Sequence, residues 1–207
     1  LTGRFTVKRG KDRSRDQSYF LFNLSQEQLS RLEFPLGDTD KKEVRRIAKE
    51  IGLTVADKKE SREICFVPDN DYASFIEKRV GEKNFHEGDI VNTDGEVLGR
   101  HRGYPAFTIG QRKGLNVGGL KEPHYVTAID PEKKEITVGL KNSLYRSDFF
   151  VNKVNWYLPR QELFEAQVQI RYLHNGSAAK VKPLPYERAY VEFFEPQLSI
   201  TPGQSAV

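Results

Sequence analysis

Hydrophobic side chains recur at helical spacing in the first third of the chain. Within residues 41–53 the apolar positions follow a helical period, and Gly52 stands where a glycine commonly ends a helix. Ser25 and Gln28 form a capping-box pair, which predicts that a short helix begins there. Residues 71–81 repeat the helical period. The apolar face of the strongest predicted helix consists of Val44, Ile47, Ala48 and Ile51. This third of the chain is therefore predicted to hold three helices, with one or two short strands.

Near residue 85 the pattern changes to short alternating runs bounded by Gly, Pro, Asn and Asp, which is typical of strands and turns. Residues 88–101 predict a hairpin that turns at Asp94-Gly95. Residues 124–140 predict a second hairpin that turns near Asp130. Later strands are expected at residues 149–157, 164–173, 178–185, 188–195 and 204–207. Strands this short and evenly spaced indicate one or two small β-barrels.

Helices in the first third and strands in the remainder indicate separate domains, because an α/β fold would alternate them along the chain. We predict a mainly β fold with an N-terminal α-helical segment. Domains are expected at residues 1–82, 83–146 and 147–207, the last of them a β-barrel. The chain contains no internal repeat and no low-complexity tract.

The chain has 207 residues and carries 33 Lys and Arg against 29 Asp and Glu, so its net charge of +4 permits an acidic partner without requiring one. A single Cys excludes an internal disulfide framework and a Cys-rich zinc site, and the four scattered His suggest no metal site. No apolar run approaches the roughly 18 residues of a membrane span, and no secretory signal is seen. We therefore expect a cytoplasmic protein without a membrane partner, with an organellar matrix as the alternative. Met is absent even from the first position, which indicates a chain that begins inside a longer protein or was processed.

Residues 4–15 contain six Lys and Arg against one Asp, a local net charge of +5. One interpretation is a solvated loop. The other is a phosphate-contacting loop, because Lys and Arg gain affinity by releasing counterions from a nucleic-acid backbone. The Gly-rich segment at residues 108–119 leaves a similar choice between a connection between strands and a close backbone approach to a phosphate or another domain.

Cys65 is the only thiol of the chain. One interpretation is a buried small hydrophobic residue, since an apolar residue flanks it on each side. The other is a reactive thiolate, because the basic residues Lys58, Lys59 and Arg62 precede it and favour the ionised form. Such a thiolate could attack an electrophile or carry a sulfane sulfur.

Four segments together resemble motifs of the tRNA-specific 2-thiouridylase family. They are residues 15–21, Arg-Asp-Gln-Ser-Tyr-Phe-Leu; residues 60–67, Glu-Ser-Arg-Glu-Ile-Cys-Phe-Val; residues 108–115, Thr-Ile-Gly-Gln-Arg-Lys-Gly-Leu; and residues 201–207, Thr-Pro-Gly-Gln-Ser-Ala-Val. The motifs follow the family's order, and the resemblance covers essentially the whole chain. It implies the remnant of an α/β ATPase domain, followed by a small central β domain and a C-terminal β-barrel.

The resemblance implies that the chain is part of an enzyme that places sulfur at C2 of the wobble uridine of tRNA. In that family ATP activates the uridine by adenylation, and a cysteine persulfide then delivers the sulfur. ATP, with Mg²⁺, is expected to be bound mainly by a domain that this chain lacks. Cys65 aligns with the persulfide-carrying cysteine. The implied partners are tRNA and a persulfide sulfur donor protein, and the protein is expected to be a monomer.

The resemblance also assigns binding residues. Gly3 corresponds to a glycine of the ATP site. The implied tRNA contacts are Arg4, Arg15, Asp16, Gln17, Arg171, Tyr172 and Gln204. Arg4 stands where the family usually has His, and Arg15 where it has Lys, so positive charge is kept or added at both positions.

Two features of the family are missing from this chain. The ATP-pyrophosphatase loop, Ser-Gly-Gly-Val-Asp-Ser, does not occur, and neither does the family's first cysteine. The chain alone is therefore expected neither to hydrolyse ATP nor to thiolate tRNA, and its first third is expected to expose apolar faces. Two alternatives are a non-catalytic tRNA-binding β-barrel module and a structural β-domain that docks a protein partner.

Overall fold

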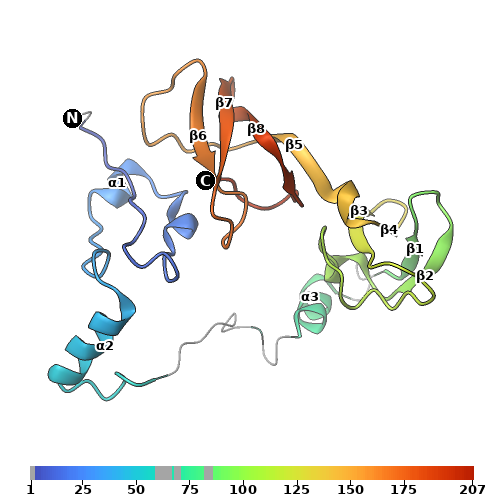
Figure 1. Ribbon diagram of the computed structural model, residues 1–207, viewed down its shortest axis with the longest axis horizontal. Coiled ribbons are helices and arrows are strands. Elements are labelled where there is room, and N and C mark those ends of the chain that lie inside the picture. Colours follow the sequence, from blue (N-terminus) through green and yellow to red (C-terminus); the bar gives the residue numbers. More distant parts are fainter. Residues whose placement is uncertain (1–2, 59–66, 68–70, 82–85) are drawn as a thin grey trace. The chain divides into compact units, whose positions relative to one another are not determined.

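The computed structural model describes residues 3–58, 67, 71–81 and 86–207 (Figure 1). The chain forms two compact units. The first unit contains Leu1–Glu60, Ser147–Glu195 and Gly203–Val207. The second unit contains Ser61–Arg146 and Pro196–Pro202. Every helix in the described part of the chain is too short or too polar to cross a membrane.

The helical elements of the first unit begin where the capping residues predict. They are η1, Ser18–Leu21; α1, Gln26–Leu29; and α2, Lys41–Glu50. The hydroxyl of Ser25 accepts from the Gln28 amide at 3.2 Å, and the Ser25 amide donates to Gln28 Oε1 at 2.8 Å. This reciprocal pair confirms the predicted capping box and satisfies two of the amides that a helix start leaves unpaired.

The segment at residues 4–10 is extended but forms no strand, and the described part of residues 1–82 contains none. One or two strands are predicted there, so this expectation is wrong for the described residues. A side chain takes the place of a partner strand: the Phe5 amide donates to Gln26 Oε1 at 2.8 Å, and Gln26 Nε2 donates to the Phe5 carbonyl at 2.9 Å. A primary amide offers the same donor and acceptor as a backbone peptide, so no second strand is needed.

The amphipathic helix α2 has no buried residue. Asp40 caps it by accepting from the Glu43 amide at 2.9 Å, and Gly52 follows it with φ of 75°, as the sequence predicts. Ile47 and Ile51 on its apolar face are 38% and 66% exposed. Other exposed apolar side chains in this part of the chain are Phe5, Phe20, Leu32, Phe34, Leu36, Leu53 and Val55. The predicted exposure of apolar faces in the first third is confirmed.

A four-stranded sheet in the order β5-β8-β7-β6 carries the core of the first unit. Its strands are β5, Tyr145–Val151; β6, Phe164–Val168; β7, Ser177–Leu184; and β8, Arg188–Leu198. Ala179 lies opposite Phe193 and Val181 opposite Val191, and all four side chains are buried. This alternation on β7 and β8 places one face of the hairpin on a core, as the period of two predicts.

The sheet is less extensive than the predicted barrel. The strand expected at residues 149–157 ends at Val151, because Lys153 has φ of 56°, which is outside the extended region. At the C-terminus only Val207 pairs, exchanging backbone hydrogen bonds of 2.9 and 2.7 Å with Gln169. Four strands are too few to close on themselves, so β5 and β6 stay as open edges of this sheet.

The second unit is built on a mixed four-stranded sheet in the order β2-β1-β4-β3. Its elements are α3, Tyr72–Val80; β1, Gly88–Val91; β2, Val97–His101; η4, Tyr104–Ala106; β3, Tyr125–Asp130; β4, Glu135–Gly139; and η5, Lys141–Leu144. Both predicted hairpins are confirmed, as β1–β2 and β3–β4, and β1 joins them by pairing parallel to β4. Ile90, Val126, Ile136 and Val138 are fully buried at the centre.

The Gly-rich segment at residues 108–119 packs onto this sheet. Gly110 donates to the Val126 carbonyl at 2.8 Å, and the Val126 amide donates to the Gln111 carbonyl at 2.9 Å. Leu115 belongs to the buried core, and a Cβ on Gly110 would stand 2.5 Å from Ser199 Oγ. These contacts support the interpretation as a connection between strands, while phosphate binding by this segment stays a prediction.

His101, at the end of β2, is 4% exposed and is held in its neutral form. Its Nε2 lies 3.0 Å from the Lys134 carbonyl, which can only accept, so Nε2 carries the proton. Nδ1 is buried and finds no hydrogen-bond partner among the described residues. Burial lowers the pKa of His101, and the opposing effects of the Lys134 carbonyl and the Asp89 carboxylate do not outweigh it.

We expect the second unit to lose stability in acid because of His101. In the unfolded chain the imidazole of His101 binds a proton near pH 6.5, whereas in the folded chain its pKa is lower. The contribution of neutral His101 to the free energy of unfolding is therefore fully present above pH 6.5, and it is lost as the pH falls toward the lowered folded pKa. Urea unfolding between pH 8 and pH 5 should show this loss in the native chain and not in His101→Gln. The exposed His86 supplies the control, because His86→Gln should keep the native pH dependence. An unchanged pH dependence in His101→Gln would contradict the assignment.

Candidate nucleic-acid interface

Two carboxylates, those of Asp12 and Asp16, hold the basic segment near the N-terminus of the first unit in its conformation by accepting hydrogen bonds. Asp12 accepts from the Ser14 hydroxyl at 2.7 Å, the Ser14 amide at 3.1 Å and the Lys41 amide at 3.3 Å. The hydroxyl of Ser14 is the main reason that the pKa of Asp12 is lowered. The basic side chains of the same segment stay exposed, as those of Lys8, Arg13 and Arg15 are. The loop therefore presents its positive charge outward.

The side chain of Asp16 is buried within this loop and does not lie on its surface. Its side chain is 7% exposed and accepts from the amide and hydroxyl of Ser18, both at 3.0 Å, and from Arg9 Nε at 3.2 Å. Burial raises the pKa of Asp16, but the hydrogen bonds from Ser18, the Gly10 amide and Arg9 outweigh it and lower the pKa. The carboxylate is thus ionised and orients Arg9.

Three aromatic rings pack beside this loop. The ring centroids of Phe20 and Tyr172 are 4.7 Å apart, and Tyr19 lies 5.3 Å from Phe20 and 6.4 Å from Tyr172. Tyr19 is buried, and its hydroxyl donates to the Ser205 carbonyl at 2.8 Å. Phe20 is 54% exposed and Tyr172 is half-buried, so two of the three rings keep surface toward solvent.

The turn that follows β6 is held by the side chain of Gln169. Its Nε2 donates to the carbonyls of Arg171 and Tyr172, at 3.1 and 2.7 Å. The His174 amide donates to the Arg171 carbonyl at 3.0 Å, and the Gly176 amide donates to His174 Nδ1 at 3.3 Å. The backbone that carries Tyr172 is therefore fixed by side-chain and main-chain contacts of its own turn.

The basic loop and this turn meet at a cavity of about 200 Å³. It is lined by Arg9, Arg13, Ser14, Asp16 and Tyr19 from the N-terminal segment and by Gln169, Tyr172, Leu173, His174 and Asn175 from the turn. Cations and aromatic rings thus share one concave surface, which is the combination that binds the phosphates and bases of unpaired nucleic acid.

The structure places six of the predicted tRNA contacts in the three segments that meet here. Asp16 and Tyr172 line the cavity itself. The others adjoin them in the chain: Arg15 and Gln17 beside Asp16, Arg171 beside Tyr172, and Gln204 beside Ser205. The hydrogen bond from Tyr19 to Ser205 joins two of these segments, although the two residues are 186 positions apart in the sequence.

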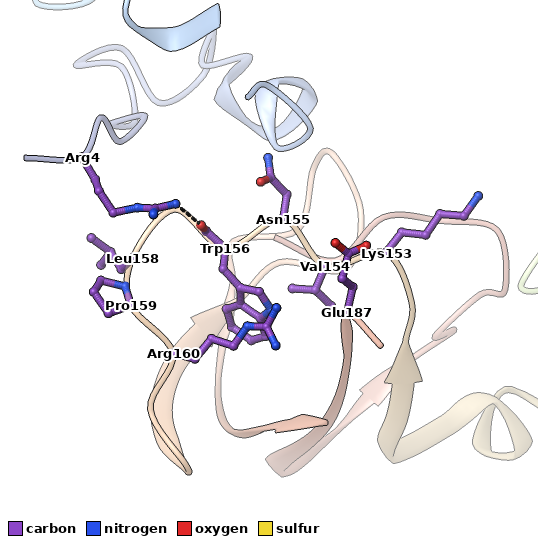
Figure 2. Close-up of a pocket in the computed structure, with 9 residues that line it drawn as sticks. All are labelled: Arg4, Lys153, Val154, Asn155, Trp156, Leu158, Pro159, Arg160 and Glu187. Carbon is purple, nitrogen blue, oxygen red and sulfur yellow. Dashed lines mark hydrogen bonds between the residues drawn. The ribbon is translucent and has the colours of Figure 1, made fainter. Parts of the chain in front are cut away.

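Two predicted residues, Arg4 and Gly3, line neither the cavity nor its flanking segments, and a third, Cys65, is not among the described residues. Arg4 donates from Nε to the Tyr157 carbonyl at 2.8 Å and from Nη2 to the Trp156 carbonyl at 3.0 Å, at a second cavity of the first unit (Figure 2). Gly3 has φ of 65°, and a Cβ built on it would meet no described atom within 4 Å. Cys65 lies outside the described residues.

Sequence reasoning missed part of the lining of the cavity. Gln169 and His174 have no flanking motif that distinguishes them, so no signal could have found them. Arg9 and Arg13 belong to the basic run at residues 4–15, but charge alone did not separate them from solvated neighbours. Their contact with Asp16, 3.2 Å for Arg9 and 4.0 Å for Arg13, is what singles them out.

Gly3 is the described residue that the resemblance assigns to an ATP site, and ATP binding there stays a prediction. Among the residues that the structure describes, no cluster of three or more His, Cys, Asp or Glu could hold a metal ion.

Three family models match the chain in succession. Residues 2–69 match the tRNA methyl transferase HUP domain, residues 73–140 the tRNA methyl transferase PRC-barrel domain, and residues 146–207 the aminomethyltransferase β-barrel domain. These models are named after methyl transfer, whereas the curated relatives are named after thiolation.

The curated relatives are tRNA-specific 2-thiouridylases. The chain is 44% identical over 100% of its length to tRNA-specific 2-thiouridylase MnmA 2 of Syntrophus aciditrophicus, of which it covers 66%. It is 48% identical over 99% of its length to the MnmA of Geotalea uraniireducens, covering 54% of it. It is 45% identical over 99% of its length to the MnmA of Carboxydothermus hydrogenoformans, covering 56% of it. The chain thus spans between about half and two thirds of the length of these relatives.

Proposed function

This chain belongs to the family of tRNA-specific 2-thiouridylases, and from that premise we propose that it is the tRNA-binding and sulfur-carrying part of an enzyme that thiolates tRNA. The enzyme would replace the C2 oxygen of the wobble uridine with sulfur. The observation that carries the proposal is the cavity at which the cations Arg9 and Arg13 meet the ring of Tyr172. That surface offers both charge for a phosphate backbone and a ring for a base.

In this proposal the residues that line or flank the cavity take different roles. Arg9 and Arg13 bind phosphates, and Tyr172, packed on Phe20, stacks with an unpaired base. Arg15, Gln17, Arg171 and Gln204 flank the cavity in sequence and extend the contact along the backbone. Asp16 acts as a positioning residue, since its carboxylate is occupied by Ser18 and Arg9.

Cys65 carries the sulfur as a persulfide in this proposal. The outer sulfur attacks C2 of a uridine whose oxygen has been adenylated, the C2–O bond breaks, and AMP leaves. The product is a mixed disulfide between C2 and Cys65, and a second thiol must attack its Cys65 sulfur to release thiouridine. Because this chain has one Cys, that thiol must lie outside it. ATP supplies the adenylate leaving group, and no described residue is assigned to that step.

The remaining predictions belong to the same proposal. The partners are tRNA and a persulfide sulfur donor protein, the cofactor is ATP with Mg²⁺, and the protein acts as a monomer in the cytoplasm. The chain is divided into domains at residues 1–82, 83–146 and 147–207. The chain alone stays catalytically inactive, because it lacks the ATP-pyrophosphatase loop and a second cysteine.

A non-catalytic tRNA-binding module is the second candidate function. It is favoured by the fact that the basic and aromatic surface lies within the described part of the chain, whereas Cys65 lies outside it. The two candidates agree on tRNA and differ on Cys65, which the module would not need. Sulfur loading of Cys65 therefore separates them.

Binding of unmodified tRNA to this chain tests the interface directly. Tyr172→Ala should weaken binding by about tenfold, because a stacked base contributes roughly 1–3 kcal/mol. Tyr172→Phe keeps the ring and should bind nearly as the native chain does. Tyr72→Ala on α3, which lines neither cavity, is the matched control. Fluorescence anisotropy of labelled tRNA measures the affinity, and thermal melting shows whether each variant is folded.

The salt dependence of the same binding reports how many phosphates are contacted. The logarithm of the association constant should fall linearly with the logarithm of salt concentration, with a slope near −0.9 for each phosphate neutralised. A flat salt dependence would favour the structural domain that docks a protein partner. Equal affinity of Tyr172→Ala and Tyr172→Phe would contradict the role of the ring.

A further inference from the structure

A second cavity of the first unit lies between the segment that follows β5 and the turn between β7 and β8. It has a volume of about 430 Å³ (Figure 2) and is lined by Arg4, Lys153, Val154, Asn155, Trp156, Leu158, Pro159, Arg160 and Glu187. Three of these side chains are cations and one is an anion. Arg4 is the only residue among them that the sequence marks as a tRNA contact.

The walls of this cavity are held in place by contacts of their own. Arg4 reaches the carbonyls of Trp156 and Tyr157 through Nε and Nη2, so its guanidinium is oriented without the use of Nη1. Asn155 Nδ2 donates to the carbonyls of Phe22 and Leu24 at 3.0 and 2.9 Å. These bonds tie the segment after β5 to the N-terminal segment of the same unit.

Two backbone turns meet on one side of the cavity. Lys153 has φ of 56° after β5, and Tyr186 and Glu187 have φ of 59° and 53° in the tight turn between β7 and β8. The Val154 amide donates to the Glu187 carbonyl at 2.8 Å and links the two turns. This side of the cavity is therefore fixed by the backbone.

The chemistry of the cavity matches a nucleotide. The guanidinium of Arg160 lies 5.8 Å from the centroid of the Trp156 ring and forms a cation–π pair with it, both residues being labelled in Figure 2. Arg160 is exposed, so its outer surface can stack with a base while its N–H groups reach a phosphate. An acidic peptide would use the cations but gain nothing from the stacked pair.

One basic segment contributes to both cavities of this unit. Arg4 lines the cavity at Trp156, while Arg9 and Arg13 line the cavity at Tyr172. We propose that the cavity at Trp156 binds a nucleotide of single-stranded RNA, with its base against Arg160 and its phosphate within reach of the cations Arg4 and Arg160. This inference rests on the proposed function, because it assigns a second contact to the same tRNA.

Trp156 is the only Trp of the chain, so its fluorescence reports on this cavity alone. Titration with unmodified tRNA, and with a short single-stranded oligoribonucleotide, should change that fluorescence with the same midpoint as the anisotropy of labelled RNA. Arg160→Glu should weaken tRNA binding by about tenfold and remove most of the fluorescence change. It should also reduce the salt slope by about 0.7–0.9, the contribution of one phosphate.

Arg45→Glu is the matched control, because it makes the same charge change on α2 without lining either cavity. Arg160→Lys keeps the charge and should recover only part of the affinity, since an ammonium group does not stack. Equal effects of Arg160→Glu and Arg45→Glu would overturn the inference, as would silent Trp156 fluorescence at saturating tRNA. An equal fluorescence response to polyglutamate would overturn it in favour of an acidic peptide.

The same measurements distinguish failure of this inference from failure of the proposed function. If the native chain binds no tRNA, the proposed function itself fails. If the native chain binds tRNA and Tyr172→Ala weakens it, while Arg160→Glu matches its control, only the site at Trp156 is wrong.

Discussion

Replacement of Cys65 with serine is expected to abolish loading of the chain with sulfur while tRNA binding is unchanged. A low-molecular-weight persulfide transfers its outer sulfur when a thiolate attacks it, so a new S–S bond forms at Cys65 and the donor leaves as a thiol. Serine cannot perform this attack, because its hydroxyl is not ionised at neutral pH. Intact mass spectrometry of the persulfide-treated chain, kept free of reductant, should show a gain of one sulfur atom in the native protein and none in Cys65→Ser.

Three controls define what the Cys65 result means. Ser61→Ala removes the hydroxyl of the residue four positions before Cys65 in the sequence and leaves the thiol, so it should load normally. Treatment with a thiol reductant should reverse the gain of mass. Absence of loading in the native chain would leave the tRNA-binding module as the better candidate. Loss of tRNA binding in Cys65→Ser would instead support the interpretation of Cys65 as a buried structural residue.

Gly88→Ala is expected to destabilise the second unit strongly. A Cβ on Gly88 would stand 1.7 Å from the Lys134 carbonyl oxygen, 2.8 Å from its carbon and 2.9 Å from His101 Nε2. The nearest atoms belong to the backbone of the β3–β4 turn, which cannot rotate away as a side chain can. Overpacking of this kind costs roughly 1–3 kcal/mol where neighbours yield, and more where they do not.

Gly118→Ala is the matched control for the Gly88 substitution. A Cβ on Gly118 would meet no described atom within 4 Å, and its φ is not positive, so alanine there should be neutral or stabilise by up to about 1 kcal/mol. Urea unfolding should separate the two variants by a clear shift in midpoint. Coincident unfolding curves would mean that β1 can move away from the β3–β4 turn, contrary to the close packing described above.

Local signals in the sequence predicted the helices and hairpins well. The Ser25–Gln28 box and the Asp94-Gly95 turn each depend on residues within a few positions of one another, and both occur as predicted. The predictions that were wrong concern which segments pair as strands. The strand expected at residues 149–157 ends at Val151, and a partner strand for Phe5 is replaced by the side chain of Gln26. Pairing partners are set by distant segments, which periodicity does not report.

The candidate site shows the same division. Motif resemblance marked Asp16 and Tyr172, and the structure places both at one cavity. It could not mark Asp16 as a residue that orients Arg9, because that role depends on which donors surround the carboxylate. Nor could it mark Arg160, whose significance comes from lying over Trp156.

By itself the sequence determined the family, the local helix and turn signals, and the identity of the single thiol at Cys65, because these are properties of short segments and their order. Only the tertiary structure decided which charged and aromatic side chains share a surface. Tyr19 and Ser205, far apart in the chain, are joined by one hydrogen bond, and Arg4 is anchored on the carbonyls of Trp156 and Tyr157. Binding depends on charges and rings within a few ångströms of one another, and such distances are set by packing between segments rather than by spacing within them.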